Sequence, residues 1–339
     1  MTIETTEAAI LVLCAEDMYV RGSVTPKPDE RIGDAGWTVV AHIISRDVIL
    51  PEFTAAQIEA GAVKKMSLDG PVFYGFLAQR DTDPTEYVAA VRGTDGFAEW
   101  AINAKFPLVP YQGVPPVPNA KVEDGFYSIY RNMKIIDLAS RTESDVAAGI
   151  AEKIGDKARV TVAGHSLGAA LATYLSLEVA ERVGDRASAV MFASPRPGNT
   201  EFAEYYNRKV TGGYRLFNYI LDTVTHIPFV IPPDLDYEPL PQQTTITPFS
   251  SSADVKVDLY CNHHLVCYMA MLNYDFAEKW MTEHGIQEDK NLFSPCVLGP
   301  RRASLNAALA ETLALLLEHL DEESLVKTLA ERLGWKPGS

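Results

Sequence analysis

Apolar runs that alternate with helical patterns are the feature that most constrains how this chain folds. Near-continuous apolar runs recur at 87–91, 159–163, 189–193 and 214–220. Strands buried on both faces have this composition, whereas half-exposed strands alternate apolar with polar residues. Helical patterns lie between these runs at 135–154 and 166–183, and Gly155 and Gly184 follow them as C-terminal stops. The alternation predicts an α/β fold around a mostly parallel sheet.

The length and composition are sufficient for one large buried core. The chain has 339 residues, of which 47% are hydrophobic and 22% charged, as in ordinary globular proteins. Because α/β folds with one sheet reach this length, we expect one domain over residues 1–300, followed by a helical extension over 301–339 that packs on the core. The net charge of −15 disfavours nucleic acid and anionic membranes as partners, since both attract basic surfaces.

The N-terminal segment does not have the pattern of a secretory signal. Glu4 and Glu7 precede its apolar run, where a signal would carry basic residues, and we interpret 8–20 as a helix. No run reaches about 20 apolar residues, so we expect no transmembrane segment. These features favour a cytoplasmic protein, with secretion as the alternative if a leader was removed. The four cysteines allow one or two disulfides and do not decide the redox compartment.

The pentapeptide GHSLG at 164–168 lies between a predicted strand and a predicted helix. A strand that turns directly into a helix strains its central residue, and flanking glycines let neighbouring backbone pass closely. Ser166 is therefore the candidate nucleophile. The backbone N–H of Leu167, at the start of the helix, is a candidate donor to the developing oxyanion. The alternative is a glycine-rich turn without chemistry.

A serine nucleophile needs a base and an orienting carboxylate, which follow it in the chain order Ser, Asp or Glu, His. Asp222 comes directly after a predicted strand, and the adjacent His263 and His264 lie farther along. Other candidates by order alone are His226 as base and, as acids, Asp234, Asp236 and Asp258. The pattern C-x-H-H-x-x-C at 261–267 could bind zinc, but its spacing matches no common zinc motif. We expect neither a metal nor a cofactor.

Three further motifs extend the pattern beyond the pentapeptide. They are VRGT at 91–94, SPRPGN at 194–199 and NYILDTVTHIP at 218–228. Together the motifs resemble those of the class 3, fungal-type lipase family of the α/β-hydrolases, namely R-G-[ST], S-P-R-x-G-N and N-x-x-D-x-V-x-x-x-P. The resemblance covers roughly residues 70–275, and it implies an α/β-hydrolase fold.

The resemblance also implies roles for particular residues. Asp222 occupies the position of the triad acid, and Thr94 that of a second oxyanion-hole residue. The family often shows H-x-L-x-x-Y, which fits residues 263–268 with His263 as the base. His264 stays an alternative, because neighbouring side chains usually point apart and only one can serve.

The segment 96–118 corresponds to the lid-like region of the family. Its proline content departs from a simple helical lid. Trp100, His165 and Phe106 are candidates for contacting the substrate, although the two aromatic residues could equally anchor a buried loop. A second departure is the segment VEDGF at 122–126, where acids precede the Gly-Phe pair and the family commonly has a histidine.

These observations predict a serine ester hydrolase that forms an acyl-enzyme. We expect a triacylglycerol lipase whose partner is an ester or lipid substrate. A lipid substrate would be met at a lipid–water interface. The alternative within enzymes is a carboxylesterase or feruloyl-type esterase for soluble esters. The alternative of another class is a catalytically silent lipase-like binding module, which would be expected to have lost Ser166, Asp222 or both histidines.

Overall fold

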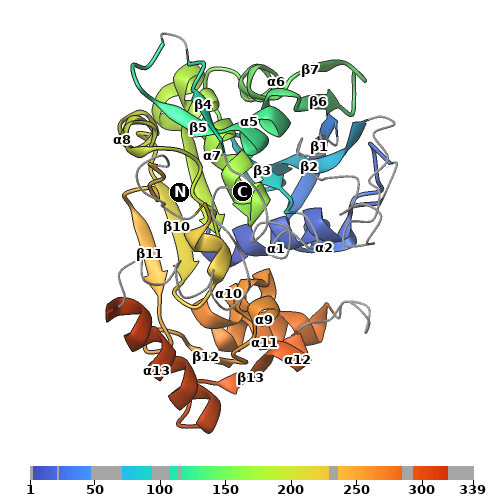
Figure 1. Cartoon of the computed structure of the whole chain (residues 1–339). Helices are drawn as coiled ribbons and strands as arrows, with labels where there is room; N and C mark the ends of the chain where they lie inside the picture. Colours follow the sequence, from blue (N-terminus) through green and yellow to red (C-terminus); the bar gives the residue numbers. More distant parts are fainter. Residues whose placement is uncertain are drawn as a thin grey trace, which may run out of the picture.

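The computed structural model describes residues 3–20, 23–46, 71–93, 107–113, 116–228, 236–284 and 293–319. Within these ranges a nine-stranded sheet forms the centre of the molecule (Figure 1), in the order β11-β10-β9-β8-β3-β2-β1-β6-β7. The strands are β1 Trp37–Arg46, β2 Pro71–Arg80, β3 Glu86–Val91, β6 Lys134–Asp137, β7 Glu143–Asp145, β8 Arg159–His165, β9 Ala187–Phe192, β10 Tyr214–Tyr219 and β11 Gln243–Ile246.

The sheet has two parts that differ in strand direction. Strands β3, β8, β9, β10 and β11 pair parallel with one another, as the sequence predicted for the runs that became β3, β8, β9 and β10. Strands β2, β1, β6 and β7 pair antiparallel. The fold is thus an α/β-hydrolase fold whose parallel part carries the carboxyl ends where catalytic loops gather.

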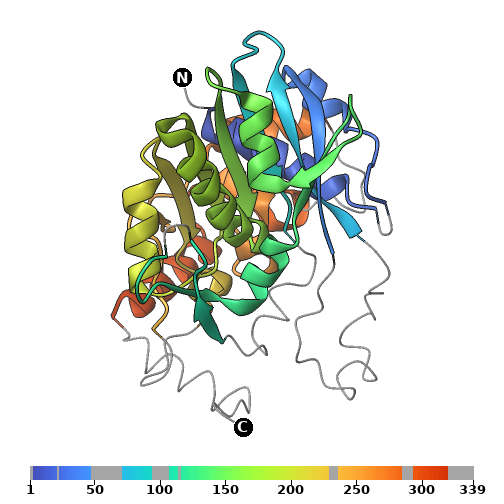
Figure 2. The same cartoon turned by 90° about the horizontal axis from the view of Figure 1, so that it is seen from above.

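Helices cover both faces of the sheet (Figure 2). Each face has its own cluster of buried apolar side chains. One face packs against α5 Asp124–Arg131, α6 Val146–Ile154, α7 Leu167–Val183 and α8 Thr200–Lys209. The other face packs against α1 Thr5–Asp17, α2 Glu30–Asp34, α10 Leu265–Leu272 and α11 Tyr274–Glu283. The N-terminal helix expected at 8–20 is therefore α1, and its residues from Ala8 to Ala15 are buried.

The helix predicted at 135–154 is wrong in its first half. Residues 134–145 form β6 and β7, and only Val146–Ile154 is helical. A tight turn in which Arg141 has a φ of 60° joins the two strands, which makes them a short polar hairpin at the sheet edge. Gly155 and Gly184 end α6 and α7 with φ values of 60° and 66°, which favour glycine.

Shorter elements lie at the rim of the sheet. They are β4 Leu108–Pro110 paired with β5 Lys121–Glu123, the 3-10 helices η1 Gly184–Arg186 and η2 Thr223–His226, α9 Leu259–His263, α12 Phe293–Cys296, and β12 Ala253–Val255 paired with β13 Val297–Pro300. In the lid-like segment 96–118, residues 107–113 and 116–118 are described. None of the helices in the described ranges has both the length and the apolar composition that crossing a bilayer requires.

The described part of the expected C-terminal extension is one helix, α13 Leu305–His319. Its buried residues include Ala310 and Ala314, which face the second apolar cluster, while Leu305 is 89% exposed. Asn306 binds Asp254 and the carbonyl of Val255 on β12. The helix is therefore joined to the small β12–β13 sheet, whose second strand precedes residue 301.

Candidate active site

Ser166 occupies the turn between β8 and α7 with the backbone conformation expected of a nucleophile elbow. Its φ is 58° and its ψ −130°, a combination that costs free energy for a residue with a Cβ atom. The N–H of Ser166 donates to the carbonyl of Phe192 at the end of β9, at 3.0 Å. This bond fixes the turn to the neighbouring parallel strand, so the strained serine is held at the carboxyl edge of the sheet.

Close backbone approaches explain the two glycines of the pentapeptide. A Cβ atom on Gly164 would lie 2.2 Å from the carbonyl oxygen of Gly168, and one on Gly168 would lie 2.4 Å from that of Val91. Distances this short are far inside van der Waals contact. The elbow therefore packs directly against the end of β3, the strand that leads to Thr94.

Ser166, His263 and Asp222 form a continuous chain of hydrogen bonds. Ser166 Oγ lies 2.7 Å from His263 Nε2, and His263 Nδ1 lies 2.8 Å from Asp222 Oδ2. Since a carboxylate can only accept, Nδ1 carries the proton and Nε2 is free to accept from the serine hydroxyl. The three residues come from three separate positions: the elbow after β8, the loop after β10 and the end of α9.

Asp222 is fully buried and each carboxylate oxygen has a protein donor. Oδ1 accepts from the backbone N–H of Val224 at 3.0 Å, and Oδ2 accepts from the hydroxyl of Tyr268 at 2.8 Å in addition to His263. Burial, with the charge of Asp222 beside it, raises the pKa of Tyr268 well above the usual value, so its hydroxyl remains a donor. These bonds fix the carboxylate in the orientation that His263 needs.

Tyr268 was not assigned a role from the sequence, although it ends the H-x-L-x-x-Y pattern. Its hydroxyl oxygen also accepts from the backbone N–H of Tyr219 at 2.8 Å. Helix α10 therefore connects the end of β10 to the acid. The spacing of five residues after His263 was the available signal for this contact.

A disulfide lies close to the base. Cys261, two residues before His263 on α9, is bonded to Cys296 at the end of α12. The other two cysteines, Cys14 and Cys267, are buried and reduced. The disulfide removes Cys261 from the set of possible zinc ligands, so the alternative zinc interpretation of 261–267 is wrong. In the described ranges no group of three His, Cys, Asp or Glu residues is arranged around a possible metal.

The alternative bases occupy other positions. His264 begins α10 and accepts from the N–H of Val266, and burial lowers its pKa to about 4, which keeps it neutral. His226 Nε2 lies 3.4 Å from the carbonyl of Ile220. The ring that hydrogen bonds to Ser166 is that of His263.

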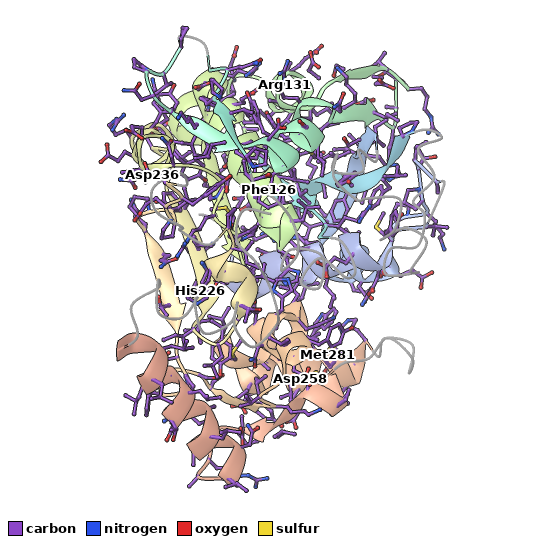
Figure 3. All side chains as sticks on the ribbon, viewed as in Figure 1. Phe126, Arg131, His226, Asp236, Asp258 and Met281 are labelled. Atoms are coloured by element: carbon purple, nitrogen blue, oxygen red, sulfur yellow. A yellow bond between two sulfur atoms is a disulfide. The ribbon has the colours of Figure 1, made fainter. Side chains whose placement is uncertain are left out.

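The alternative acids that the structure describes also have other partners. Asp258 begins α9 and accepts from the N–H groups of Tyr260 and Cys261, and Asp236 binds the hydroxyl of Thr200 at the start of α8. Figure 3 shows these two aspartates in separate parts of the molecule. Asp234 lies outside the described residues.

The candidate oxyanion hole is described in part. Leu167 is the first residue of α7, and N–H groups of a first helical turn have no acceptor within their helix. Its N–H is therefore available beside Ser166. Thr94, Trp100 and Phe106 lie outside the described residues. The oxyanion-hole role that the resemblance implies for Thr94 and the candidate substrate contacts of Trp100 and Phe106 therefore stay predictions.

The SPRPGN motif holds the loop after β9. The N–H of Ser194 donates to the side chain of Asn218 at 2.9 Å, and that of Arg196 to the carbonyl of Ile227 at 2.7 Å. Gly198 packs so closely on the carbonyl of Lys121 that a Cβ atom would lie 2.4 Å from it. Asn199 caps α8. The motif is thus structural, and it connects the site to β5.

Glu123, one of the acids in the segment that departs from the family pattern, is buried at the start of α5. Its carboxyl oxygens accept from the N–H groups of Gly125 and Phe126. Burial raises its pKa to about 8, against the opposing effect of these two bonds. Glu123 therefore caps α5. It takes no part in the two hydrogen bonds that join Ser166, His263 and Asp222.

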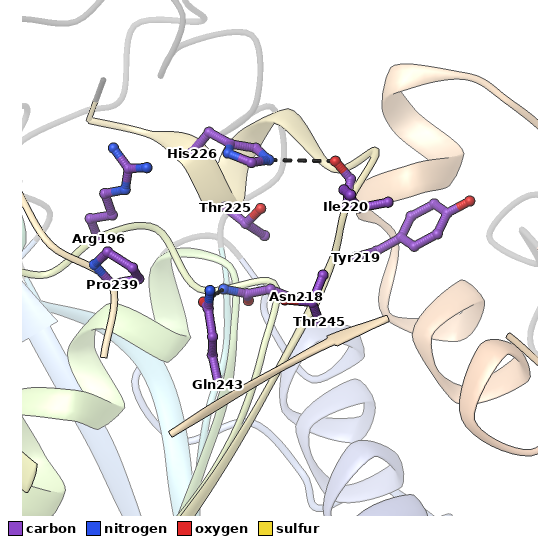
Figure 4. A pocket seen from close by; sticks show the side chains of 9 residues that line it. All are labelled: Arg196, Asn218, Tyr219, Ile220, Thr225, His226, Pro239, Gln243 and Thr245. Atoms are coloured by element: carbon purple, nitrogen blue, oxygen red, sulfur yellow. Dashed lines mark hydrogen bonds between the residues drawn. The ribbon is translucent and has the colours of Figure 1, made fainter. Parts of the chain in front are cut away.

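A small pocket of about 130 Å³ opens beside the loop after β10 (Figure 4). Its lining residues are Arg196, Asn218, Tyr219, Ile220, Thr225, His226, Pro239, Gln243 and Thr245. None of Ser166, Asp222 and His263 is among them, and the volume is smaller than the several hundred Å³ typical of a ligand site. The pocket is therefore not the acyl-binding site.

Comparison with known proteins agrees with this arrangement. The family model "Lipase (class 3)" matches residues 88–231, which include the elbow and Asp222. The chain is 30% identical over 162 residues to phospholipase A1-Ialpha2 of Arabidopsis thaliana, covering 43% of this chain and 33% of that protein. It is also 30% identical over 159 residues to the galactolipase DONGLE of Arabidopsis thaliana, covering 42% and 34%.

Among solved structures, the lipase of Rhizopus microsporus var. chinensis is similar, at 22% identity and a TM-score of 0.46, with 66% of this chain and 67% of that chain covered. The chain spans about a third of the length of the two Arabidopsis relatives named above. The fold and the elbow define an α/β-hydrolase in which Ser166 occupies the position of the nucleophile. Within that class, residues 88–231 are similar to the class 3 lipase family.

Proposed function

We propose that this chain is a serine ester hydrolase that releases fatty acids from glycerolipids through an acyl-enzyme. The observation that carries the proposal is the chain of hydrogen bonds from Ser166 through His263 to Asp222, at 2.7 and 2.8 Å. A strained elbow presents the serine at one end, and full burial isolates the aspartate from water at the other.

In the first half of the reaction, Ser166 Oγ attacks the ester carbonyl while His263 Nε2 takes its proton. Asp222 stabilises the resulting imidazolium through Nδ1–H, and His263 then gives the proton to the departing alcohol. In the second half, water attacks the acyl-enzyme while His263 Nε2 takes its proton. His263 then returns that proton to Ser166 Oγ as the bond from Oγ to the acyl carbon breaks and the fatty acid leaves. The N–H of Leu167 donates to the oxyanion in both halves, with Thr94 as the second donor; one such donor is worth about 3 kcal/mol.

Polar glycerolipids are the favoured substrate class. The two curated relatives named above are a phospholipase A1 and a galactolipase. The net charge of −15 opposes binding to anionic lipid surfaces, so zwitterionic and neutral headgroups suit this chain better. Triacylglycerol, which the sequence predicted, carries the same acyl ester and is the second candidate, in keeping with the family.

Fatty-acid release from matched lipids tests the proposal. Purified protein is assayed on phosphatidylcholine vesicles, galactolipid vesicles, a triolein emulsion and soluble p-nitrophenyl butyrate. Ser166→Ala should abolish release from all of them, while Ser188→Ala, on the neighbouring strand β9, should not. Hydrolysis only of the soluble ester would replace the lipid substrate by the esterase alternative. No hydrolysis and no labelling of Ser166 by a fluorophosphonate would indicate the silent module.

A further inference from the structure

Two ionisable residues beside the site have no part in the mechanism above. Glu16 lies near the end of α1, and His165 precedes the nucleophile in the elbow. Their side chains are 22% and 7% exposed, and His165 Nδ1 lies 2.8 Å from Glu16 Oε1. The two residues are 149 positions apart in the sequence, so the contact exists only because α1 packs across the ends of β3 and β8.

Both ring nitrogens of His165 face acceptors. Nδ1 faces the carboxylate of Glu16, and Nε2 lies 2.7 Å from the backbone carbonyl of His263. A carbonyl can only accept, so Nε2 carries a proton. With a carboxylate at Nδ1, the arrangement is that of an imidazolium donating from both nitrogens, paired with an ionised Glu16.

Through this pair, three parts of the site are connected. Glu16 Oε1 also accepts from the backbone N–H of Gly93 at 3.4 Å, at the end of β3. His165 belongs to the elbow, and its second bond holds the backbone of His263 itself. The rings of His165 and His263 lie 5.0 Å apart at 33°. The pair therefore joins the strand before Thr94, the nucleophile turn and the base.

Charges around the pair support the ionised form. Burial alone would lower the pKa of His165, but the charge and hydrogen bond of Glu16 outweigh it and raise that pKa. Burial would likewise raise the pKa of Glu16, but His165 lowers it. The other titratable groups that face the pair are His263 on α9, His264 at the start of α10, Tyr268 on α10 and Asp222 after β10. His264 is neutral, so Glu16 is the main partner of the His165 charge.

We propose that Glu16 and His165 are positioning residues that hold the backbone of His263 and the end of β3 against the elbow, so that the imidazole of His263 stays aligned on Ser166. The proposal rests on the proposed function for its catalytic consequence. It reassigns His165, which the sequence suggested as a substrate contact. A positional shift of the base by about 1 Å can lower the rate roughly 100-fold, which gives a distant helix a direct effect on kcat.

Kinetics on soluble p-nitrophenyl butyrate provide the first test, with active sites counted by fluorophosphonate titration. Glu16→Ala should lower kcat per titrated site by roughly 10- to 100-fold and leave KM within about twofold. Glu16→Gln should recover much of the loss. The glutamine amide N–H can donate to Nδ1 of a neutral His165, while Nε2–H of that ring still donates to the backbone carbonyl of His263. Glu7→Gln is the matched control, since Glu7 is on α1 and pairs with Arg80 away from the site.

A merely structural role would lower the melting temperature and the number of titratable sites, without changing kcat per site. That result for a folded Glu16→Ala variant would overturn the proposal, as would an equal loss of kcat in Glu7→Gln.

Nitrogen-15 NMR of histidine-labelled protein provides a test that does not depend on activity. At about pH 8, where free histidine is neutral, one ring should be doubly protonated in the wild type. Its signal should be absent in His165→Asn and lost in Glu16→Ala, and the Nδ1–H signal of His263 should broaden in Glu16→Ala. If the wild type hydrolyses no ester but these changes occur, the proposed function fails and the positioning stands. If the His263 signal is unchanged in Glu16→Ala, the positioning fails whatever the activity.

Discussion

Breaking the Cys261–Cys296 disulfide should weaken both the fold and the site. The bond closes a loop of 35 residues, and in the chain-entropy description a loop of that length stabilises the folded state by about 4 kcal/mol. For 339 residues, the entropy of unfolding near the midpoint is roughly 0.7 kcal/mol/K. Dividing the stabilisation by this entropy gives an expected fall in melting temperature of about 6 °C. A fall in kcat should accompany it, since Cys261 shares α9 with His263.

The assay compares the wild type, the wild type reduced with dithiothreitol, and Cys296→Ser, by thermal melts and p-nitrophenyl butyrate hydrolysis. The reduced wild type and Cys296→Ser should melt together, and reductant should not change Cys296→Ser further. A thiol count in denaturant should give two free thiols before reduction, from Cys14 and Cys267. Four free thiols, or equal melting temperatures with and without reductant, would refute the reasoning. Two free thiols in protein from its native compartment would oppose the cytoplasmic expectation, because cytosolic reductants keep most thiols reduced.

Three other substitutions give separable outcomes. His263→Ala should lower kcat by about four decades or more, while His264→Ala keeps most activity; the reverse pattern in ester hydrolysis would contradict the base assignment. Tyr268→Phe removes one of the donors to Asp222 and should lower kcat roughly tenfold, from about 1.4 kcal/mol, with KM unchanged; no change in kcat would mean that the bond is dispensable. Glu123 has a folded pKa of about 8 against an ordinary 4.5, so its stabilising contribution is complete below about pH 4.5 and is lost as the pH rises to about 8. Melting curves across that range should show Glu123→Gln gaining stability over the wild type, and parallel curves would refute the shift.

The parallel half of the fold was predictable because its strands are buried on both faces. Their apolar runs are nearly continuous, as at β3 and β8, where only Arg159 is not fully buried. Strands β1 and β2 escaped recognition. The buried polar residues His42 and Ser45 interrupt the apolar pattern of β1. Gly75 interrupts that of β2, where a Cβ atom would lie 2.0 Å from the carbonyl oxygen of Ala90.

The candidate site divides in the same way. Ser166, Asp222 and His263 could be proposed from the sequence because the elbow has a local pattern and because the order of the three along the chain is restricted. The structure joins their side chains by hydrogen bonds. Glu16 was not found, since nothing near it in the sequence indicates a partner 149 residues away. Contacts that depend on how a helix docks across the sheet have no local signature.

The docking of α1 also affects how the chain folds as it is synthesised. Its apolar residues pack against β3, β8 and α10, and the last of these elements is made roughly 250 residues after α1. At about 5–20 residues per second, the first helix leaves the ribosome on the order of 10–50 seconds before its binding surface is complete. During that interval the apolar face of α1 is exposed to chaperones, and the connection from Glu16 to His263 is among the last parts of the molecule to form.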